Sequence, residues 1–407
     1  MATPFERRVT TVQASLNAVE GDAVVLSPSP NLTYLTGFEE SPSERLFVLV
    51  VPRRGDPTFV VPTMYEEQLP ARYDSRLWDD ADDPLEVLAA CLRDHGVVSS
   101  VGVDDGTSSS DDGSTASTGG QSIDADGDVP RLLLDDSMWA TFVLDVQSLV
   151  PSGDFGLASA VLEPARIRKD DLELETLRRA GALADRVSLE IRERSEEFVG
   201  ASEADLAAEI DRLLVEYGGR APSFTTIVAS GPNGARPHHH SGNRLIEAGD
   251  PVVLDFGAFV EADLEEGSAA YPGDQTRTLV LEGDPPESYR EIHEVVQEAQ
   301  EAAVEAVEPG VTAGEIDRTA RSIIEEAGYG NAFLHRTGHG VGLEVHEPPY
   351  IVDGNDRELE PGMVFSVEPG IYLDGEFGVR IEDLVVVTDD GYERLNDTPR
   401  GWDCREW

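Results

Sequence analysis

Ionisable side chains set within short apolar segments constrain this chain more than any other feature. Three histidines and two glutamates between residues 335 and 382 lie on such segments, which glycine residues interrupt: His335, His339, His346, Glu368 and Glu382. An isolated buried charge is very costly, so an apolar strand that carries a carboxylate must give it a partner. Imidazole and carboxylate groups together are typical ligands of divalent first-row metal ions. The sequence therefore predicts a metal site to which several strands contribute.

The charge balance limits the partners of this protein. Its 407 residues include 31 Lys and Arg against 80 Asp and Glu, a net charge of −49, although 40% of the residues are hydrophobic. Nucleic acid and anionic membranes would be repelled by such a chain. We therefore expect a folded protein whose very acidic, halophilic surface is adapted to high salt, where screening weakens self-repulsion.

Cysteine usage and hydropathy favour a cytoplasmic location. Cys91 and Cys404 are too few for a disulfide framework or a thiolate metal site. A reducing compartment is therefore expected. The N-terminal residues have no apolar run behind them, and no apolar stretch approaches membrane-spanning length.

A chain of this length exceeds one ordinary core, so two domains are expected. Residues 1–162 alternate strand and helix patterns and predict a smaller α/β domain. Its predicted strands are 23–26, 46–51, 57–62 and 101–103, and its predicted helices are 5–20, 84–95 and one within 131–162. Residues 104–130 are Asp, Ser, Gly and Thr with almost nothing to bury, which predicts an acidic low-complexity insertion. The charged segment around residue 168 marks the hinge to a second domain, 163–407.

The second domain contains an internal repeat. A long helix over about 170–198 and a helix after Ser202 precede a histidine-rich segment, and helices over about 287–307 and after Thr312 precede another. The second helices of the two pairs have similar sequences: residues 208–212 are Ala-Glu-Ile-Asp-Arg and residues 314–318 are Gly-Glu-Ile-Asp-Arg. We interpret this pattern as two halves of one duplicated unit, whose histidines face a shared cleft.

Two strands between the halves carry aspartates. Asp255 ends an apolar run, and Asp274 begins the next one. Paired as a hairpin, the two strands would bring both carboxylates together, with residues 258–273 as an acidic loop. Collected with the later residues, this gives a set of four carboxylates and one imidazole: Asp255, Asp274, His339, Glu368 and Glu382. One ion would not need so many charges, whereas two ions about 3.5–4 Å apart that share carboxylates would, and such a pair can hydrolyse an amide.

The motifs around these residues resemble those of the pita-bread metallopeptidases, the family of Xaa-Pro aminopeptidases, prolidases and methionine aminopeptidases. The matching segments are Asp255-Phe256-Gly257, Asp274 to Thr278, Gly338 to Leu343, Val367 to Gly370 and Arg380 to Asp383. Residues 31–38 resemble the creatinase-like N-terminal domain of proline-specific members. The resemblance implies an α/β (α+β) fold: a pita-bread domain of two pseudo-symmetric helix-helix-strand halves around a curved antiparallel sheet, preceded by the creatinase-like domain.

The resemblance also implies roles for individual residues. Two divalent ions, Mn, Co or Zn, would be held by the five ligands, with Asp274 and Glu382 bridging. Glu368 would serve as ligand and proton shuttle, Arg380 would fix carboxylates in place, and accessory histidines correspond to His238, His335 and His346. The neighbouring His239 and His240 leave open which imidazole enters the site. Relatives are often dimers, so a homodimer is expected.

The implied activity is hydrolysis of the amide bond between an N-terminal residue and proline. Arg357 lies where some dipeptidases have an arginine that could bind a free carboxylate, and Tyr350 occupies another such position, so dipeptides and longer peptides stay open. The alternatives are a non-catalytic interaction module and a carbon–nitrogen hydrolase acting on a small non-peptide substrate.

Overall fold

The computed structural model describes residues 3–98 and 129–404. The chain divides into two compact units, Met1–Ala165 and Arg166–Trp407. The strand predicted at 101–103 and nearly all of the insertion predicted at 104–130 lie outside the described residues. No helix in the described part is long and apolar enough to cross a membrane.

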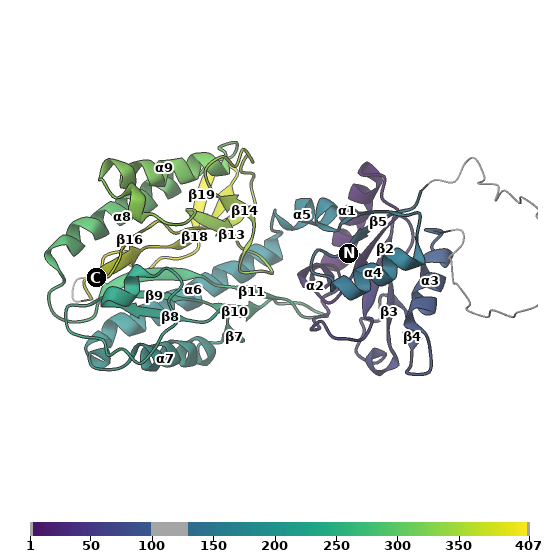
Figure 1. Ribbon diagram of the computed structural model, residues 1–407, viewed down its shortest axis with the longest axis horizontal. Helices are drawn as coiled ribbons and strands as arrows, with labels where there is room; N and C mark the ends of the chain where they lie inside the picture. The colour runs from purple at the N-terminus through teal and green to yellow at the C-terminus, as the bar shows by residue number, and fades with distance from the viewer. Residues whose placement is uncertain (1–2, 99–128, 405–407) are drawn as a thin grey trace, which may run out of the picture. The chain divides into compact units, whose positions relative to one another are not determined.

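The first unit is built on a six-stranded mixed sheet (Figure 1). The strand order is β4-β3-β2-β1-β5-β6, and the strands are β1 (Ala23–Leu26), β2 (Val48–Pro52), β3 (Thr58–Pro62), β4 (Asp74–Trp78), β5 (Arg131–Leu134) and β6 (Asp154–Leu157). The first three are fully buried apolar runs, as the sequence predicts. The strands β5 and β6 escaped prediction, because a run such as Leu132 to Leu134 fits a buried helix as well as a strand.

Helices complete the first unit: α1 (Pro4–Ala18), α2 (Pro30–Thr36), α3 (Pro84–Asp94), α4 (Ala140–Leu149) and α5 (Ser159–Arg166). Local chemistry sets where they begin. The Thr3 hydroxyl caps α1 with Glu6 in a capping box, and Asp83 caps α3. One hydrophobic cluster joins the sheet to α3 and α4, for example through Val25, Leu88 and Val146.

The second unit contains two helix pairs, α6 (Asp171–Glu193) with α7 (Glu203–Glu216), and α8 (Glu287–Glu305) with α9 (Ala313–Glu326). Each pair has its own hydrophobic cluster: α6 and α7 pack on strands of the first half, α8 and α9 on strands of the second. Figure 1 shows α8 and α9 on one side of the strands and α7 on the other. The helices predicted after Ser202 and Thr312 both begin there, each with a capping box, formed with Asp205 and Glu315 respectively.

One contact recurs in the two halves. Asp211 and Asp317 occupy the same place in the repeated helix motif, and each carboxylate accepts a hydrogen bond from a threonine that precedes the next strand. The Thr226 hydroxyl lies 2.5 Å from Asp211 and the Thr337 hydroxyl 2.8 Å from Asp317. This recurrence supports the interpretation of the second domain as a duplicated unit.

The first half carries a sheet of order β12-β9-β8, in which all neighbours are antiparallel. Its strands are β8 (Ile227–Ser230), β9 (Pro251–Phe256) and β12 (Gln275–Val280), and the adjoining sheet consists of β7 (Ala221–Pro222), β10 (Ala258–Glu261) and β11 (Ala270–Pro272). The prediction of a loop over 258–273 is wrong at both ends, because β10 and β11 pair with each other. Their apolar residues Val260 and Tyr271 are buried, and the acidic residues lie between the two strands.

The second half contributes a five-stranded antiparallel sheet, order β14-β13-β15-β18-β19, and a hairpin β16-β17. The strands are β13 (Gly338–Gly340), β14 (Glu347–Ile351), β15 (Val364–Val367), β16 (Gly370–Leu373), β17 (Phe377–Arg380), β18 (Asp383–Thr388) and β19 (Gly391–Arg394). The predicted candidate ligands His339, Glu368 and Glu382 lie within or beside these short strands. The predicted mixed α/β class with antiparallel sheets therefore matches the architecture.

Candidate active site

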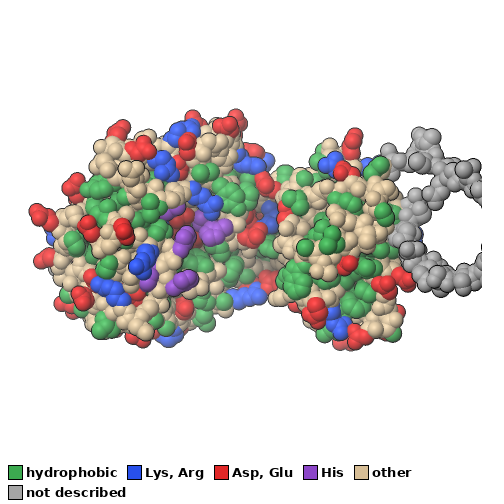
Figure 2. All heavy atoms as spheres, viewed as in Figure 1, with side chains coloured by type: hydrophobic (Ala, Val, Ile, Leu, Met, Phe, Trp, Pro, Cys, Tyr) green, Lys and Arg blue, Asp and Glu red, His purple; other side chains and the backbone are tan. Residues whose placement is uncertain are grey.

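A cavity of about 540 Å³ in the second unit is lined by side chains from both halves. Figure 2 shows histidine side chains gathered on one face of this unit, beside arginines. The charged and imidazole residues of the lining are His238, His239, His240, Asp255, Asp274, His335, Arg336, His339, His346, Glu368, Arg380 and Glu382. All nine site residues predicted from the sequence therefore line one cavity.

Close strand packing places the two aspartates together. The strands β9 and β12 pair with Asp255 opposite Thr276, two residues after Asp274. Between the paired segments, a Cβ on Gly257 would lie 1.8 Å from the carbonyl oxygen of Gly273. Only glycine permits this approach, which lets one long hairpin present both carboxylates on the cavity side.

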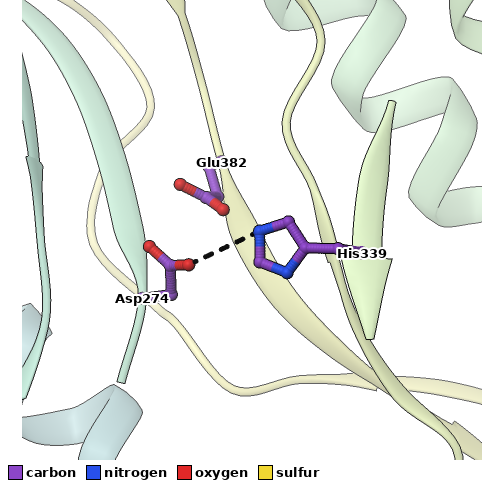
Figure 3. A group of neighbouring side chains, drawn as sticks. All are labelled: Asp274, His339 and Glu382. Atoms are coloured by element: carbon purple, nitrogen blue, oxygen red, sulfur yellow. Dashed lines mark ion pairs between the residues drawn. The ribbon is translucent and has the colours of Figure 1, made fainter. Parts of the chain in front are cut away.

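His339, Asp274 and Glu382 converge from three different strand segments (Figure 3). One ligand atom from each lies within 4.8 Å of the others, and all three side chains are buried. His339 Nε2 lies 3.8 Å from Asp274 Oδ2 and 3.3 Å from Glu368 Oε1. Four residues of the predicted ligand set thus surround one point, and Asp255 lines the same cavity.

The burial of so many carboxylates perturbs their protonation. Desolvation and the neighbouring carboxylates Glu382 and Asp255 raise the pKa of Asp274 well above its ordinary value. Desolvation, with Asp255 also opposing ionisation, raises the pKa of Glu368 to about 7. Burial lowers the pKa of His339 to about 3, so its imidazole is neutral at pH 7. The carboxylates repel one another, and the neutral imidazole cannot compensate their charge. A bound cation would reduce this repulsion.

Two oxygens support a metal directly. Asp255 Oδ1 and Glu382 Oε1 are buried, and no hydrogen-bond donor reaches either of them from the described residues. Their sister oxygens are satisfied, since Arg380 lies 2.5 Å from Asp255 Oδ2 and the Thr276 hydroxyl donates to Glu382 Oε2 at 2.7 Å. Buried polar atoms normally have partners. These two oxygens, in an oxygen-rich site with one imidazole, fit ligands of divalent cations.

Arg380 organises the wall beside Asp255. Its Nη1 lies 2.9 Å from the Tyr372 hydroxyl, which in turn lies 2.8 Å from His335 Nε2. His335 Nδ1 lies 2.7 Å from the backbone carbonyl oxygen of Arg336 and must donate to it, so Nε2 accepts from Tyr372. Burial and Arg380 lower the pKa of His335 to about 4. His335 is therefore neutral and held in one tautomer. Its hydrogen bond with Tyr372 fixes the ring at the cavity wall.

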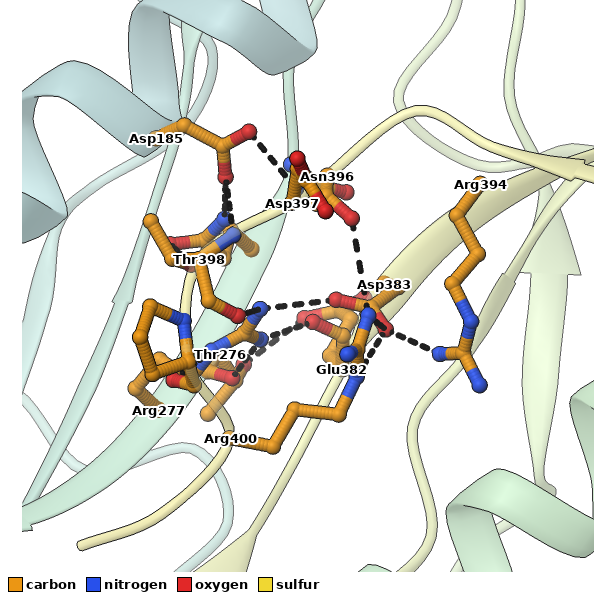
Figure 4. Close-up of polar contacts among 12 residues, drawn as sticks. Asp185, Thr276, Arg277, Glu382, Asp383, Arg394, Asn396, Asp397, Thr398 and Arg400 are labelled. Carbon is orange, nitrogen blue, oxygen red and sulfur yellow. Dashed lines mark hydrogen bonds and ion pairs between the residues drawn. The ribbon is translucent and has the colours of Figure 1, made fainter. Parts of the chain in front are cut away.

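Behind the cavity, Asp383 fixes the strand that carries Glu382 (Figure 4). Its buried carboxylate lies 2.8 Å from Arg277, 2.5 Å from Arg394 and 2.6 Å from Arg400. Arg277 also donates to the Glu382 backbone carbonyl at 2.5 Å. Neighbouring residues on a strand point to opposite faces, so Glu382 faces the cavity while Asp383 anchors the strand from behind.

The three consecutive histidines have separate surroundings. His239 Nε2 lies 2.8 Å from Glu203, a fully buried carboxylate that also accepts from Ser230 and Asn233. His238 and His240 line the cavity without such an anchor. Of the three imidazoles, His239 is therefore the one held by a buried carboxylate.

His346 lies beside the candidate ligand His339, with the ring centroids 4.1 Å apart in a T-shaped contact. The next residue, Glu347, is buried and accepts from Lys169 Nζ at 2.8 Å and Arg166 at 2.6 Å. Burial alone would raise the pKa of Glu347, but Lys169 and Arg166 bring it below its ordinary value. An ionised carboxylate therefore ties the segment that carries His346 to the start of the second unit.

Three further residues at or beside the cavity were not predicted from the sequence: Tyr372, Thr276 and Arg336. Tyr372 lies on β16, in another sheet than the strand before Glu368, so its place beside Arg380 and His335 follows from tertiary contacts and not from spacing. Thr276 could have been found from its spacing, since it follows Asp274 by two residues and alternate residues of a strand share a face. Arg336 lines the cavity, whereas Arg357, a candidate for carboxylate binding, is exposed and does not belong to the lining. No signal within the sequence separates these two arginines.

Comparison with known proteins agrees with this geometry. Residues 175–389 match the model of metallopeptidase family M24, and residues 8–125 match the creatinase/prolidase N-terminal domain. An Xaa-Pro dipeptidase of Lactobacillus helveticus is 35% identical, over 96% of both chains.

Solved structures give the same result. A prolidase from Thermococcus sibiricus superposes with a TM-score of 0.83 at 35% identity, covering 99% of this chain and all of its own. The dipeptidase PepE from Mycobacterium ulcerans superposes with a TM-score of 0.82 at 36% identity, covering 98% of this chain and 97% of its own. With both of its units matched and a cavity whose ligand set suits divalent cations, the chain belongs to metallopeptidase family M24.

Proposed function

We propose that this protein is an Xaa-Pro dipeptidase that uses two divalent metal ions to hydrolyse the amide bond between an N-terminal residue and proline. The observation that carries the proposal is the convergence of four carboxylates and His339 on one cavity, with two buried carboxylate oxygens lacking donors among the described residues. The names of the relatives, an Xaa-Pro dipeptidase and a prolidase, support the choice of substrate.

The residues that would hold the ions in this proposal are Asp255, Asp274, His339, Glu368 and Glu382. Two bound divalent ions would supply a hydroxide nucleophile at neutral pH and polarise the amide carbonyl. The identity of the metal stays open among Mn, Co and Zn, because sites rich in oxygen ligands accept several ions and availability decides.

Side chains of the cavity would transfer protons and orient the catalytic groups. Glu368 would serve as the proton shuttle that protonates the leaving proline nitrogen. His346 and His238 also line the cavity, where an imidazole N–H could stabilise charge that develops on the carbonyl oxygen. Arg380 holds Asp255 and, through Tyr372, the ring of His335.

The cavity suits a small substrate with an apolar ring. Phe224, Ile227, Pro237 and Val345 contribute its apolar lining. A volume of about 540 Å³ accommodates a dipeptide, since pockets for small ligands range from about 300 to 1,000 Å³. The complete ligand set favours catalysis over a non-catalytic interaction module, and the dipeptidase relatives disfavour a non-peptide substrate.

The test is hydrolysis of Ala-Pro and Gly-Pro by protein loaded with Mn or Co at high salt. We expect release of proline, loss of activity on chelation, and a fall of at least about 100-fold in kcat for Glu368→Gln, the size typical of a lost proton-transfer group. Glu265→Gln, at an exposed position in the hairpin, is the matched control. A metal-loaded protein that cleaves neither dipeptide contradicts the proposal. The homodimer and the cytoplasmic location stay predictions.

A further inference from the structure

The turn that carries His238 is not part of any sheet. Residues 236–242 belong to no helix or strand, although they lie between β8 and β9. His238 is exposed and lines the cavity, and no group within residues 3–98 and 129–404 forms a hydrogen bond or an ion pair with its ring. After burial, its charge is among the groups that lower the pKa of both His335 and His346, so the three imidazoles lie near one another. The position of the His238 ring therefore depends on the backbone on either side of it.

Two buried groups hold that backbone. Before His238, the Arg380 guanidinium donates to the carbonyl oxygen of Pro237 at 3.4 Å. After it, His239 Nε2 lies 2.8 Å from Glu203 Oε2. The side chain of His239 is 11% exposed and that of Glu203 is 0% exposed, so this bond lies behind the cavity surface. His238 thus lies between two anchored residues.

Glu203 joins the segments on both sides of the turn. It is the first residue of α7, and its carboxylate accepts from the backbone N–H and the hydroxyl of Ser230 at 2.8 Å each and from Asn233 at 3.0 Å. The backbone N–H of Gly242 donates to it at 3.3 Å. Ser230 ends β8 and Gly242 follows the three histidines. One buried side chain therefore holds the start, the middle and the end of the segment.

Glu203 is ionised in the folded protein. Burial alone would raise the pKa of its carboxyl, but hydrogen bonds from Ser230, Asn233 and His239 bring it below the ordinary value. An ionised carboxylate can only accept, so His239 Nε2 carries a hydrogen and donates it to Glu203. Among the described residues no lysine or arginine forms an ion pair with Glu203. The buried charge therefore depends on these hydrogen-bond donors.

We propose that Glu203 and His239 are positioning residues, whose hydrogen bond fixes the turn and so directs the His238 ring toward the reacting carbonyl. The inference rests on the proposed function and adds the contact that orients one of its imidazoles. Neither residue needs to touch the substrate for this role. A displacement of about 1 Å in a catalytic group can lower a rate about 100-fold, so a bond behind the cavity can control turnover.

A double-mutant cycle separates this role from a general contribution to stability. In protein loaded with Mn, His239→Leu should lower kcat for Ala-Pro by about 10- to 100-fold with little change in KM, because the turn loses its anchor. His239→Gln should recover most of kcat, since its amide N–H can still donate to Glu203. In a His238→Ala background, His239→Leu should lower kcat by less than about 3-fold, because the group that it positions is gone. Glu216→Gln, at the other end of α7 and 55% exposed, is the matched control.

The hydrogen bond can also be observed without turnover. In Zn-loaded protein with isotope-labelled histidine, nuclear magnetic resonance should show a His239 Nε2 proton that exchanges slowly with water, assigned by its absence in His239→Gln. This signal should be lost in Glu203→Gln and kept in His238→Ala.

The outcomes distinguish the inference from the proposed function. Equal losses of kcat for His239→Leu with and without His238, no loss at all, or a slowly exchanging proton that persists in Glu203→Gln overturn the inference, while wild-type cleavage of Ala-Pro keeps the proposed function. A wild-type protein that leaves Ala-Pro intact overturns the proposed function itself.

Discussion

At the scale of single residues, the segment between His339 and His346 requires a glycine at position 342. A Cβ on Gly342 would lie 2.2 Å from the Glu347 carboxylate. Lys169 and Arg166 hold that carboxylate at 2.8 and 2.6 Å, so it cannot move aside without breaking a buried ion pair. The glycine is therefore required by packing against a fixed charge.

Gly342→Ala should lower the free energy of unfolding by about 1–3 kcal/mol, the usual cost of an overpacked site. It should also lower kcat, since the displaced Glu347 carries His346 with it. Chemical denaturation and dipeptide turnover measure the two effects. Gly401→Ala, where no atom lies within 4 Å of the added Cβ, is the control. An unchanged unfolding midpoint in Gly342→Ala would mean that Glu347 is not held in place.

At the scale of elements, helix α8 buries an imidazole that takes no part in the site. His293 is 1% exposed, packs against Tyr289 with ring centroids 5.7 Å apart, and its Nε2 has no hydrogen-bond partner among the described residues. Burial, with Arg192 and Arg277, lowers its pKa to about 3. The ordinary histidine pKa is about 6.5. Below about pH 6.5 the unfolded chain therefore binds a proton at His293 that the folded chain does not bind. Acid should for this reason lower the free energy of unfolding.

The sign of the effect is fixed by that pKa difference. Stability from neutral His293 is complete above about pH 6.5 and is lost as the pH falls toward 3, by up to about 1.4 kcal/mol per pH unit. His293→Phe should remove this slope, so the free energies of unfolding of the two proteins converge or cross in acid. Denaturation curves between pH 7 and 4.5 measure the difference, and metal ligands contribute equally to both. Parallel pH profiles would contradict the assignment.

Elements whose signals are local could be predicted from the sequence, and those set by distant contacts could not. The boxes at Ser202 and Thr312 need only residues three positions apart, and both helices begin there. The strand pairing of β10 with β11 was missed because the acidic residues between them dominate the composition, while burial of Tyr271 depends on a hydrogen bond to Glu173 in α6. The five candidate ligands were found because each lies in a distinctive motif.

At the scale of the whole molecule, net charge opposes compactness. The difference between 31 basic and 80 acidic residues leaves −49 charges on one folded chain. Self-repulsion of this size destabilises the compact state and weakens as the Debye length shrinks from about 10 Å at 0.1 M salt to 3 Å at 1 M. Salt should therefore stabilise this protein more than it stabilises a chain of balanced charge.

The unfolding temperature should rise steadily when KCl is raised from 0.1 to 2 M, with most of the gain at the lower concentrations, where screening changes fastest. Thermal unfolding followed by circular dichroism measures it, with metal present at saturation throughout. Sucrose at matched osmolality separates screening from general exclusion effects. An unfolding temperature that stays constant or falls with KCl would show that surface charge does not limit stability.

The predicted metal site forms only when the second unit is folded as a whole, because its five ligands come from both halves of that unit. Metal content after equilibrium dialysis against Mn tests it most directly. The account predicts close to two ions per wild-type chain and at most one in Glu382→Gln, since the shared carboxylate is lost. Glu265→Gln should keep both. Two tightly bound ions in Glu382→Gln, or none in the wild type, would contradict the central claim that these side chains form a dinuclear metal site.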